Sequence, residues 1–476
     1  MVPPARCSSS ARPPTRSAAR AGLREILGEY GDHDRVRGHV PRLTVQWQDS
    51  TLAVPIVPAP TGDGAEPPGT RKVPVSRMSD EPSIAIVGAG PAGLTLAHLL
   101  RREGIPFVVF ERRSAADLCR SPKSGLIEYR TVDLLRREGI APSVLDFVVE
   151  NHSCEFRTPD ESVVLDYASL TGGRPHYIYP QHQLVRRLCT TLIEAGGEIR
   201  FGHRVGAVRQ DREGVVLSVD EPGGDRSDIR CGVAVGCEGS RSPVAAAMTG
   251  SRVDEQELPV RWLVILAAAP PLEKHTIYAA HPRGFAGQMR RGPDQSRYML
   301  EIPVTDSTVE WPEPRVRSEL AVRLGVGNRL DDVPLVEFGV LNLRVRVTEP
   351  MQDGALFLAG DAAHLITPAG GKGMNLAIQD AIELAHGLIE RFGGSDDDRR
   401  LSAYSQTRLP QIWRTQAFSN WHLRLILTSL RDGGEPDGAA PGGFSYGLRQ
   451  GWIGALQRDP VFARWFAYAY AGVDPD

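Results

Sequence analysis

Three glycines beside an apolar run have the spacing of a phosphate-binding turn. Gly88, Gly90 and Gly93 follow residues 83–87 and form the pattern Gly-x-Gly-x-x-Gly. The first glycine allows a tight turn, the second lets a phosphate approach the backbone, and the third lets a helix pack closely. Glu111 follows about twenty residues later, where a carboxylate accepts hydrogen bonds from ribose hydroxyls. These residues predict a dinucleotide site, for either FAD or NAD.

The segments around these glycines have the patterns that such a site requires. Residues 83–87 indicate a buried strand, residues 94–102 carry apolar side chains at helical spacing, and residues 106–110 indicate a second strand that ends at Glu111. The N-terminus of the helix would offer free N–H groups and a favourable dipole to an anion. The other residues that we expect to contact the dinucleotide here are Pro91, Ala92 and Arg112.

A second stretch, residues 355–375, repeats the arrangement of a strand, an acid and a helix. Its apolar run ends at Asp361, and a helix is expected to begin near Gly373, followed by Met374 and Asn375. A carboxylate at a strand end can hold a ribityl hydroxyl, and a helix N-terminus offers N–H donors to the pyrimidine end of a flavin. An NAD enzyme has no need of this second site, so FAD is the predicted cofactor.

Three segments together resemble a known family. They are GAGPAGL at 88–94, IYAAHPRGFA at 277–286 and LAGDAAHLITPAGGKGMNLA at 358–377. They resemble the single-component flavoprotein aromatic hydroxylases, most closely the 4-hydroxybenzoate 3-monooxygenase branch, and the resemblance runs from about residue 83 to residue 472. It implies that NADPH or NADH reduces FAD, that O₂ adds at the flavin C4a atom, and that the hydroperoxide hydroxylates an activated phenol.

The resemblance also implies roles at the phenol end of the substrate. Tyr278 matches the family's tyrosine at the substrate hydroxyl, and Tyr470 matches its relay partner, with Tyr468 as a competing candidate. Pro368 lies where the family places a prolyl carbonyl beside that hydroxyl. Removing the hydroxyl proton makes the ring electron-rich, and a tyrosine pair can carry that proton outward. Alternatively, the tyrosines are core residues with satisfied hydroxyls.

The other end of the substrate site departs from the family pattern. The positions of its serine, arginine and tyrosine read Met289, Arg291 and Met299, and a one-residue shift would place Arg290 at the site instead. Arg297 matches an arginine near the flavin. Losing two hydroxyl donors to a carboxylate costs about 1.5–3 kcal/mol each. We therefore expect weaker binding of 4-hydroxybenzoate and a larger or less polar aromatic substrate.

Further cofactor contacts follow from the resemblance alone. Gln181 matches a glutamine near the flavin, and Lys123 keeps the charge of a pyrophosphate-binding arginine without its planar fork. Glu238 replaces the aspartate of an Asp-Gly step, Arg241 falls where a histidine helps hold NADPH, and Ala245 replaces an arginine. The choice between NADH and NADPH stays open.

Composition places the chain among globular proteins. It has 476 residues, a net charge of −3 and 41% hydrophobic residues, and no apolar run reaches the about 18–20 residues of a membrane span. The charge gives no reason to expect nucleic acid or an anionic membrane as partner. The six cysteines form no C-x-x-C pair, and we expect reduced thiols, no metal and a cytoplasmic location. The expected partners are a small aromatic substrate, O₂ and a second copy in a homodimer.

The predicted fold is α/β: a Rossmann-like FAD-binding domain of the glutathione-reductase type, an antiparallel substrate sheet and C-terminal helices. We expect residues 140–182 to be largely irregular and Pro410, Pro441 and Pro460 to interrupt the C-terminal helices. The predicted parts are a disordered extension (1–80, with Met78 as an alternative start), the FAD-binding domain (81–253), the substrate sheet (254–348), a second FAD-binding segment (349–395) and a helical interface region (396–476).

Two other functions stay open on the same residues. A flavin dehydrogenase, oxidase or epoxidase could use the same scaffold, because a fold does not determine its chemistry. A flavoprotein that binds an aromatic effector without catalysis is the other alternative. Within the hydroxylases, a larger aromatic or indolic compound from specialised metabolism is the alternative to a hydroxybenzoate.

Overall fold

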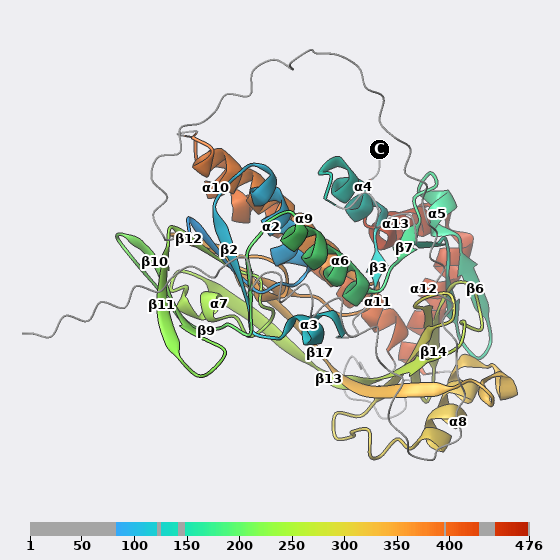
Figure 1. Ribbon diagram of the computed structural model, residues 1–476. Helices are drawn as coiled ribbons and strands as arrows, with labels where there is room; N and C mark the ends of the chain where they lie inside the picture. Colours follow the sequence, from blue (N-terminus) through green and yellow to red (C-terminus); the bar gives the residue numbers. More distant parts are fainter. Residues whose placement is uncertain (1–81, 121–124, 141–147, 395–396, 428–442, 475–476) are drawn as a thin grey trace, which may run out of the picture.

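The computed structural model describes residues 82–474, apart from 121–124, 141–147, 395–396 and 428–442 (Figure 1). The predictions for residues 1–80, Lys123 and Pro441 lie outside the described residues. In the part that is described, no helix is both long enough and apolar enough to cross a membrane.

A six-stranded sheet carries the phosphate-binding turn. Its strand order is β18-β19-β12-β1-β2-β8, and all pairings are parallel except that of β18 with β19. Every residue of β1 and β12 is buried, as expected for a parallel sheet that is covered on both faces. The strands are β1 (Ile84–Val87), β2 (Phe107–Glu111), β8 (Ile199–Phe201), β12 (Val233–Gly236), β18 (Gln352–Asp353) and β19 (Leu356–Leu358).

Three helices pack together beside this sheet. Helix α2 (Pro91–Arg102) packs against α9 (Lys372–Phe392) and α6 (Gln181–Glu194), so the segments that carry the two predicted flavin sites are neighbours. Figure 1 shows α2, α6 and α9 side by side. The first strand, helix and second strand were all predicted, and α2 begins at Pro91, three residues before the predicted start.

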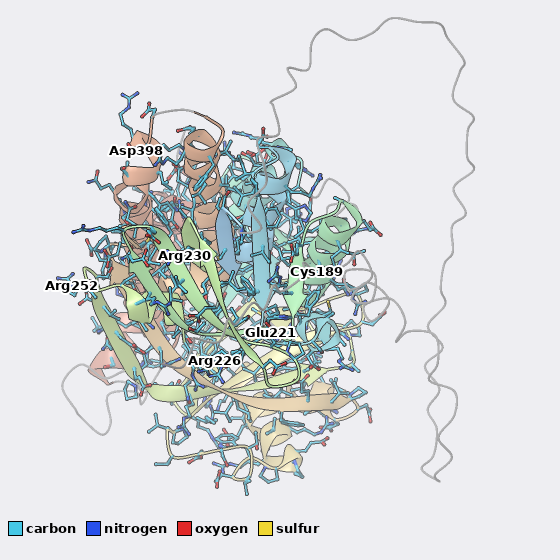
Figure 2. All side chains as sticks on the ribbon, turned by 60° about the vertical axis from the view of Figure 1, so that its left-hand side comes forward. Cys189, Glu221, Arg226, Arg230, Arg252 and Asp398 are labelled. Atoms are coloured by element: carbon cyan, nitrogen blue, oxygen red, sulfur yellow. The ribbon has the colours of Figure 1, made fainter. Side chains whose placement is uncertain are left out.

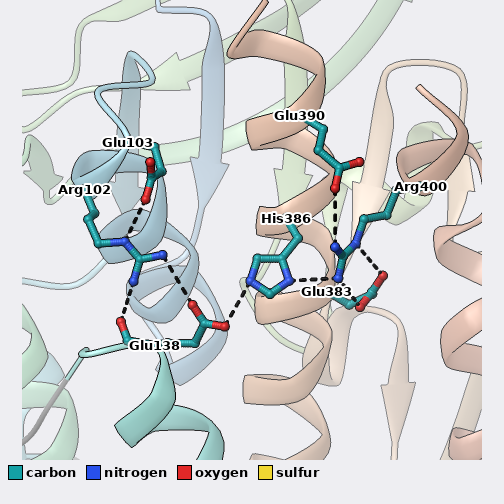
Figure 3. A network of polar contacts seen from close by, with 7 residues as sticks. All are labelled: Arg102, Glu103, Glu138, Glu383, His386, Glu390 and Arg400. Atoms are coloured by element: carbon teal, nitrogen blue, oxygen red, sulfur yellow. Dashed lines mark hydrogen bonds and ion pairs between the residues drawn. The ribbon is translucent and has the colours of Figure 1, made fainter. Parts of the chain in front are cut away.

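Polar contacts fix the far ends of these helices (Figure 3). The Arg102 guanidinium donates to the Glu138 carbonyl at 2.5 Å, and the Glu138 carboxylate accepts from His386 Nε2 at 3.0 Å. Arg400 in turn donates to His386 Nδ1 at 2.8 Å and to Glu383 at 3.0 Å. Because Arg400 donates to Nδ1, the proton of the neutral imidazole lies on Nε2. The network joins α2 to α9 and α10.

An eight-stranded sheet forms the second layer, in the order β20-β17-β13-β16-β15-β14-β5-β6. All its pairings are antiparallel except that of β5 with β14. Its long strands β13 and β17 run together beneath the helices (Figure 1). The strands are β5 (Cys154–Arg157), β6 (Ser162–Leu165), β13 (Arg252–Ala267), β14 (Thr276–His281), β15 (Gly284–Arg290), β16 (Ser296–Ile302), β17 (Leu335–Glu349) and β20 (His364–Leu365).

The prediction that residues 140–182 are largely irregular is wrong. Strands β5 and β6 arise from this stretch and extend the substrate sheet, although they precede residue 254. The sheet therefore draws on residues outside the predicted range 254–348. Each of these strands has only four residues, and the partner of β5 lies far along the chain, so local periodicity could not reveal the pairing.

Two small sheets complete the strands. The sheet β11-β10-β9 carries charged side chains, among them Arg226 and Arg230 in Figure 2, which donate to Asp220 and Asp211. The sheet β3-β7-β4 contributes Leu126 and Ile178 to the candidate site, and Gly125 directly precedes it. The remaining elements are β3 (Leu126–Ile127), β4 (Val149–Asn151), β7 (His176–Ile178), β9 (Arg204–Asp211), β10 (Gly214–Asp220), β11 (Arg226–Cys231), α3 (Ala115–Arg120), α4 (Tyr129–Arg137), α5 (Tyr167–Leu170), α7 (Pro243–Ala247), α8 (Glu313–Leu324), η2 (Gly327–Leu330) and η3 (Gly360–Ala362).

The C-terminal part is helical, as predicted. Its helices are α10 (Arg399–Ser402), α11 (Tyr404–Ile426), α12 (Phe444–Arg458) and α13 (Pro460–Ala471). The prediction that Pro410 interrupts a helix is wrong, because α11 continues through it with buried residues on both sides. Tertiary packing outweighs the hydrogen bond that proline removes. Pro460 does separate two helices, as predicted: α12 ends at Arg458, and Pro460 begins α13, where a missing N–H costs little.

The tryptophans of these helices divide into two kinds. Trp421 packs against Trp452, Phe462 and Trp465 at ring-centroid distances of 5.2–5.8 Å. By contrast, Trp413, Trp452 and Trp465 are 39%, 44% and 47% exposed. The predicted homodimer stays a prediction, and these aromatic rings are the surface on which to test it.

Candidate active site

The glycine turn after β1 has two glycines that the protein itself requires. A Cβ atom at Gly88 would lie 2.6 Å from the Cys237 carbonyl oxygen, and one at Gly93 would lie 2.0 Å from the Gly88 carbonyl oxygen. Packing within the chain does not explain Gly90, because its Cβ would come no closer than 3.8 Å to the same Cys237 oxygen. A group that approaches Gly90 from outside the chain is the remaining physical reason for a glycine there.

The start of helix α2 is suited to an anion. Gly90 is its N-cap and Pro91 its first residue, no side chain caps the free N–H groups, and the first turn holds no acidic residue. The uncapped N–H groups and the helix dipole attract negative charge. Gly90, Pro91 and Ala92 therefore fit the phosphate contact predicted for them.

Glu111 lies at the end of β2, next to the glycine turn. Its carboxylate accepts a hydrogen bond from the Ala89 N–H at 2.9 Å and forms an ion pair with Arg113, whose Nε lies 2.9 Å away. The structure thus places Arg113 against the acid, whereas the predicted Arg112 is exposed. Sequence reasoning missed Arg113, although side chains two residues apart on an extended chain point the same way.

Asp361 lies where strand β19 leads into the turn η3. Its carboxylate has no partner among the described residues, and a Cβ at Gly373 would lie 3.9 Å from its Oδ1. A buried acid behind it, Asp380, holds this turn by accepting hydrogen bonds from the Gly360 N–H at 3.1 Å and Arg408 at 2.7 Å. Asp361 is thus pre-positioned with its oxygens available.

Burial opposes ionisation of Asp380, but its contacts outweigh that cost. His364 lies 2.5 Å from its Oδ2, and the charges of His364 and Arg408 lower the pKa of Asp380 to about 2 despite desolvation. The carboxylate is therefore ionised across the physiological range. The prediction did not include Asp380, because an acid in the middle of a helix gives no sequence signal of its partners.

The N-terminus of α9 adjoins Asp361, as predicted. Gly371 caps the helix in a left-handed conformation, and no side chain caps its N–H groups. The Asn375 side chain is fully used within the protein, because it donates to the Leu126 and Gly371 carbonyls and accepts from the Glu128 N–H. The N–H groups of the first turn, which include those of Gly373 and Met374, are what the start of α9 offers to the predicted contact with a flavin.

The predicted tyrosine pair is brought together where helix α13 packs against the substrate sheet. The hydroxyl oxygens of Tyr278, on β14, and Tyr470, on α13, are hydrogen-bonded at 2.9 Å, and both side chains are buried. Burial raises the pKa of both phenols, so both are protonated at neutral pH. The competing Tyr468 is half-buried and lies outside this contact.

A buried cation holds Tyr470 from behind. The Lys372 ammonium donates to the carbonyls of Tyr470 and Ala469 at 2.6 and 3.0 Å and pairs with Glu128 at 2.7 Å, which uses all three of its donors. His176 Nε2 also donates to the Tyr470 carbonyl at 2.9 Å. The main chain of Tyr470 is thereby clamped beside a positive charge.

The loop before α9 reaches the same tyrosines. The Tyr278 hydroxyl is hydrogen-bonded to the backbone of Gly370, which has a φ of +79°. The Pro368 carbonyl, predicted to lie beside the substrate hydroxyl, accepts a hydrogen bond from the Gly371 N–H at 3.1 Å. This loop connects the candidate flavin contacts to the candidate phenol end.

A pocket lies further along the same face of the sheet. Its lining comes from β3 and β7 on one side and from β14, β15 and β16 on the other: Gly125, Leu126, Ile178, Thr276, Met289, Arg290, Arg291 and Arg297. Both Arg290 and Arg291 line the pocket. The structure therefore does not decide between the two alignments, which differ by one residue. Met289 is directly opposite Arg297 across β15 and β16.

The positive charges at this pocket are concentrated and poorly solvated. Arg291 is buried, and burial together with its charge lowers the pKa of Arg297 to about 10. The Nε atoms of Arg290 and Arg297 are buried without a hydrogen-bond partner among the described residues. Buried guanidinium nitrogens without a hydrogen-bond partner, such as these two Nε atoms, favour an anion in the pocket.

Met299 forms the wall between this pocket and the tyrosines. It is buried and lies opposite Gly287, where a Cβ would come within 2.8 Å of the Met299 methyl carbon. Gly287 in turn lies opposite Tyr278. The thioether therefore fills the space that the missing side chain of Gly287 leaves.

The remaining predicted residues lie around these sites without forming one cluster. Gln181 begins α6, and Arg241 is exposed in the turn after Glu238. Glu238 accepts a hydrogen bond from Ser242 at 2.7 Å, and burial raises the pKa of Glu238 to about 7. No contact in the structure assigns the nicotinamide to Arg241.

The two strand-end sites, one with a phosphate-binding turn and one with an available carboxylate beside a helix N-terminus, fit opposite ends of FAD and define a flavoprotein. A family model described as "FAD binding domain" matches residues 81–419. The chain belongs to this family, and its relatives identify it as an FAD-dependent monooxygenase of the aromatic hydroxylase type, with NAD(P)H as co-substrate.

Curated relatives share a substantial part of the chain. It is 33% identical to a p-hydroxybenzoate hydroxylase of Acinetobacter baylyi over 347 residues, which cover 72% of this chain and 85% of that protein. It is 30% identical to the 12-dehydrotetracycline 5-monooxygenase/anhydrotetracycline 6-monooxygenase of Streptomyces rimosus, covering 69% and 66%. Among solved structures, the OxyS anhydrotetracycline hydroxylase from Streptomyces rimosus gives a TM-score of 0.66 at 27% identity, covering 83% and 76%.

Proposed function

We propose that this protein hydroxylates a phenol whose hydroxyl binds at Tyr278 and whose far end faces Arg291 and Arg297. The observation that carries the proposal is the buried hydrogen bond between Tyr278 and Tyr470, on the same sheet as the arginine-lined pocket. When bound, FAD would supply the redox chemistry, because NAD(P)H reduces the flavin and the reduced flavin activates O₂. The chain's own residues hold the phenol, exclude water and accept its proton.

The register of the sheet supports this orientation. Tyr278 lies opposite Gly287 and Gly287 opposite Met299, while Met289 and Arg297 form the next such row. Residues two apart on a strand point to the same face about 7 Å apart. This separation suits an aromatic ring with its hydroxyl at the first row and a substituent at the second.

Proton transfer from the phenol is the step that the tyrosines are suited to assist. The substrate O–H bond breaks as Tyr278 accepts the proton, the Tyr278 proton passes to Tyr470, and the Tyr470 proton leaves outward to solvent, so that the negative charge ends on the phenolate. Both phenols are neutral before the reaction because burial raises the pKa of each. The Lys372 charge beside Tyr470 favours the negative charge that passes through the pair.

The two rows support a substrate other than 4-hydroxybenzoate. Met299 in the first row and Met289 in the second offer flexible apolar contact and no hydrogen-bond donor, whereas the arginines still favour an anionic or strongly polar substituent. We therefore favour a phenol larger than 4-hydroxybenzoate that retains such a substituent. An indolic compound is the alternative within this class.

A substrate panel tests the proposal. FAD-loaded protein is mixed with NADPH or NADH and a series of phenols and indoles, with and without a carboxylate, and nicotinamide oxidation is followed beside product mass. We expect oxidation stimulated by an acidic phenol larger than 4-hydroxybenzoate, with a gain of one oxygen in the product. Stimulated oxidation without an oxygenated product from any compound would contradict hydroxylation and favour a dehydrogenase or oxidase.

A further inference from the structure

His422 is a buried polar residue that the site described above does not use. It lies on α11, its side chain is fully buried, and neither ring nitrogen has a hydrogen-bond partner among the described residues. Leaving a buried imidazole unpaired reduces the stability of the folded state, so such a group needs an explanation. An apolar side chain of similar size would fill the same space without that cost.

The surroundings of His422 are those of the tyrosine pair. Its ring lies 4.7 Å from the Tyr278 ring and 5.9 Å from the Tyr470 ring, both edge to face. A Cβ at Gly370 would lie 3.8 Å from His422 Nδ1, 3.9 Å from Tyr470 Cε2 and 3.6 Å from Lys372 Cε. The Gly370 backbone is also hydrogen-bonded to the Tyr278 hydroxyl. Histidine, lysine and both tyrosines thus converge on one loop position.

The imidazole is neutral in these surroundings. Burial and the charge of Lys372 lower the pKa of His422 to about 3. The titratable groups that face it or the pair are Tyr278, Tyr470, Lys372 with its partner Glu128, Cys154, Tyr167 and His176. Of these groups, only Glu128 is a carboxylate, and it is paired with Lys372. None of them is therefore a free carboxylate that could stabilise a second proton on His422. A neutral imidazole always carries one N–H donor.

We propose that His422 is a positioning residue for hydroxylation, whose neutral N–H stabilises the negative charge that the phenolate shares with Tyr278 through their hydrogen bond once the proton has left through the pair. The inference rests on the proposed function of that pair. A neutral imidazole suits this task because it donates a hydrogen bond to an oxyanion without first giving up its own charge, as neutral histidines do beside other developing oxyanions. Before the reaction the His422 nitrogens are unpaired, because the imidazole N–H forms its hydrogen bond only after the proton transfer.

Two apolar variants and one polar variant test the proposal. His422→Phe and His422→Met remove the donor, and His422→Asn retains an N–H. Each FAD-loaded protein is saturated with 4-hydroxybenzoate, and the ionisation of the bound phenol is followed by ultraviolet difference absorbance against pH. We expect both apolar variants to raise the pKa of the bound phenol by about one unit, and His422→Asn to restore at least part of the shift.

A packing role gives a different result. If His422→Phe and His422→Met raise the melting temperature and leave the phenol pKa at the wild-type value, the proposal is wrong. Having two apolar variants allows for one that does not fold. Tyr278→Phe distinguishes this result from a failure of the proposed function. If that variant also leaves the phenol pKa and product formation unchanged, the tyrosine pair has no role. In that case both the proposed function and the proposed role of His422 are wrong.

Discussion

The two ends of the candidate substrate site are built in opposite ways. At the tyrosine end, the hydroxyls of Tyr278 and Tyr470 are neutral, buried and bonded to each other. At the pocket end, Arg291 and Arg297 are cationic, Met289 lies beside them, and Met299 stands between the pocket and the tyrosines. The first end has the groups that a shared reaction needs, and the second has the groups that distinguish one substrate from another. We infer that the chemistry of the family is kept while the choice of substrate has changed.

The largest effect is expected at the tyrosine end. Tyr278→Phe removes the first proton acceptor, and we expect hydroxylated product to fall by about 100-fold or more while nicotinamide oxidation continues. Product mass measured against NAD(P)H consumed checks this. Tyr468→Phe is the control, since Tyr468 is half-buried on α13, the helix of Tyr470, and lies outside the pair. Equal losses in the two variants would show that the loss does not depend on the tyrosine pair.

At the pocket end we expect a loss of binding without loss of chemistry. Arg291→Met removes a charged donor, so KM for an acidic phenol should rise about 10- to 100-fold with kcat little changed. Steady-state oxidation of NAD(P)H measures both constants. Arg290→Met is the comparison, because Arg290 lines the same pocket one residue away. A larger effect from Arg290→Met would show that the anion binds there instead.

Restoring hydroxyl donors sharpens the contrast further. The double variant Met289→Ser with Met299→Tyr should lower KM for 4-hydroxybenzoate by about tenfold, since one net hydrogen bond contributes about 1 kcal/mol. The side chain at 299 lies over Gly287, which leaves room on that strand for an aromatic ring. The same assay with 4-hydroxybenzoate measures the change. An unchanged KM would mean that these two positions do not contact the far end of the substrate.

The smallest effect is a pH dependence at the pocket. Burial and the neighbouring charge of Arg291 lower the pKa of Arg297 to about 10 from its usual 12.5, so Arg297 is cationic below that pH and neutral above it. Affinity for a carboxylate-bearing phenol should therefore decline a few-fold as pH rises through about 10, since Arg291 remains. Flavin-fluorescence titration of binding across pH 8–11 measures this. In Arg297→Gln the decline should disappear, and a decline that persists would assign it to another group.

The flavin-binding part was more predictable than the substrate part. The first strand, helix and second strand were read correctly, because the glycines and the apolar spacing are local signals. The same reasoning predicted a strand end at Asp361 and a helix start near Gly373, but it could not predict Asp380, whose role depends on His364 and Arg408 outside its own part of the helix. Local patterns identify the residues that face a ligand more readily than the residues that support them.

Where the prediction failed, long-range contacts decided the structure. Strands β5 and β6 were missed because four residues give too short a period, and Pro410 was expected to break a helix that tertiary packing maintains. The sequence pattern does not indicate a role for His422, because a lone histidine on a helix is usually a core or surface residue. Only its position beside Tyr278 and Gly370 gives it a candidate role.

The parallel pairing of β5 with β14 has a consequence for protein engineering. The hairpin Cys154–Leu165 leaves the ribosome long before its partner Thr276–His281, and until then β5 has an open edge that can pair with another molecule. A chimera that exchanged residues 254–348 between two relatives would leave this hairpin behind and join mismatched edges. Transplanting substrate preference therefore requires residues 154–165 to travel with the sheet that they complete.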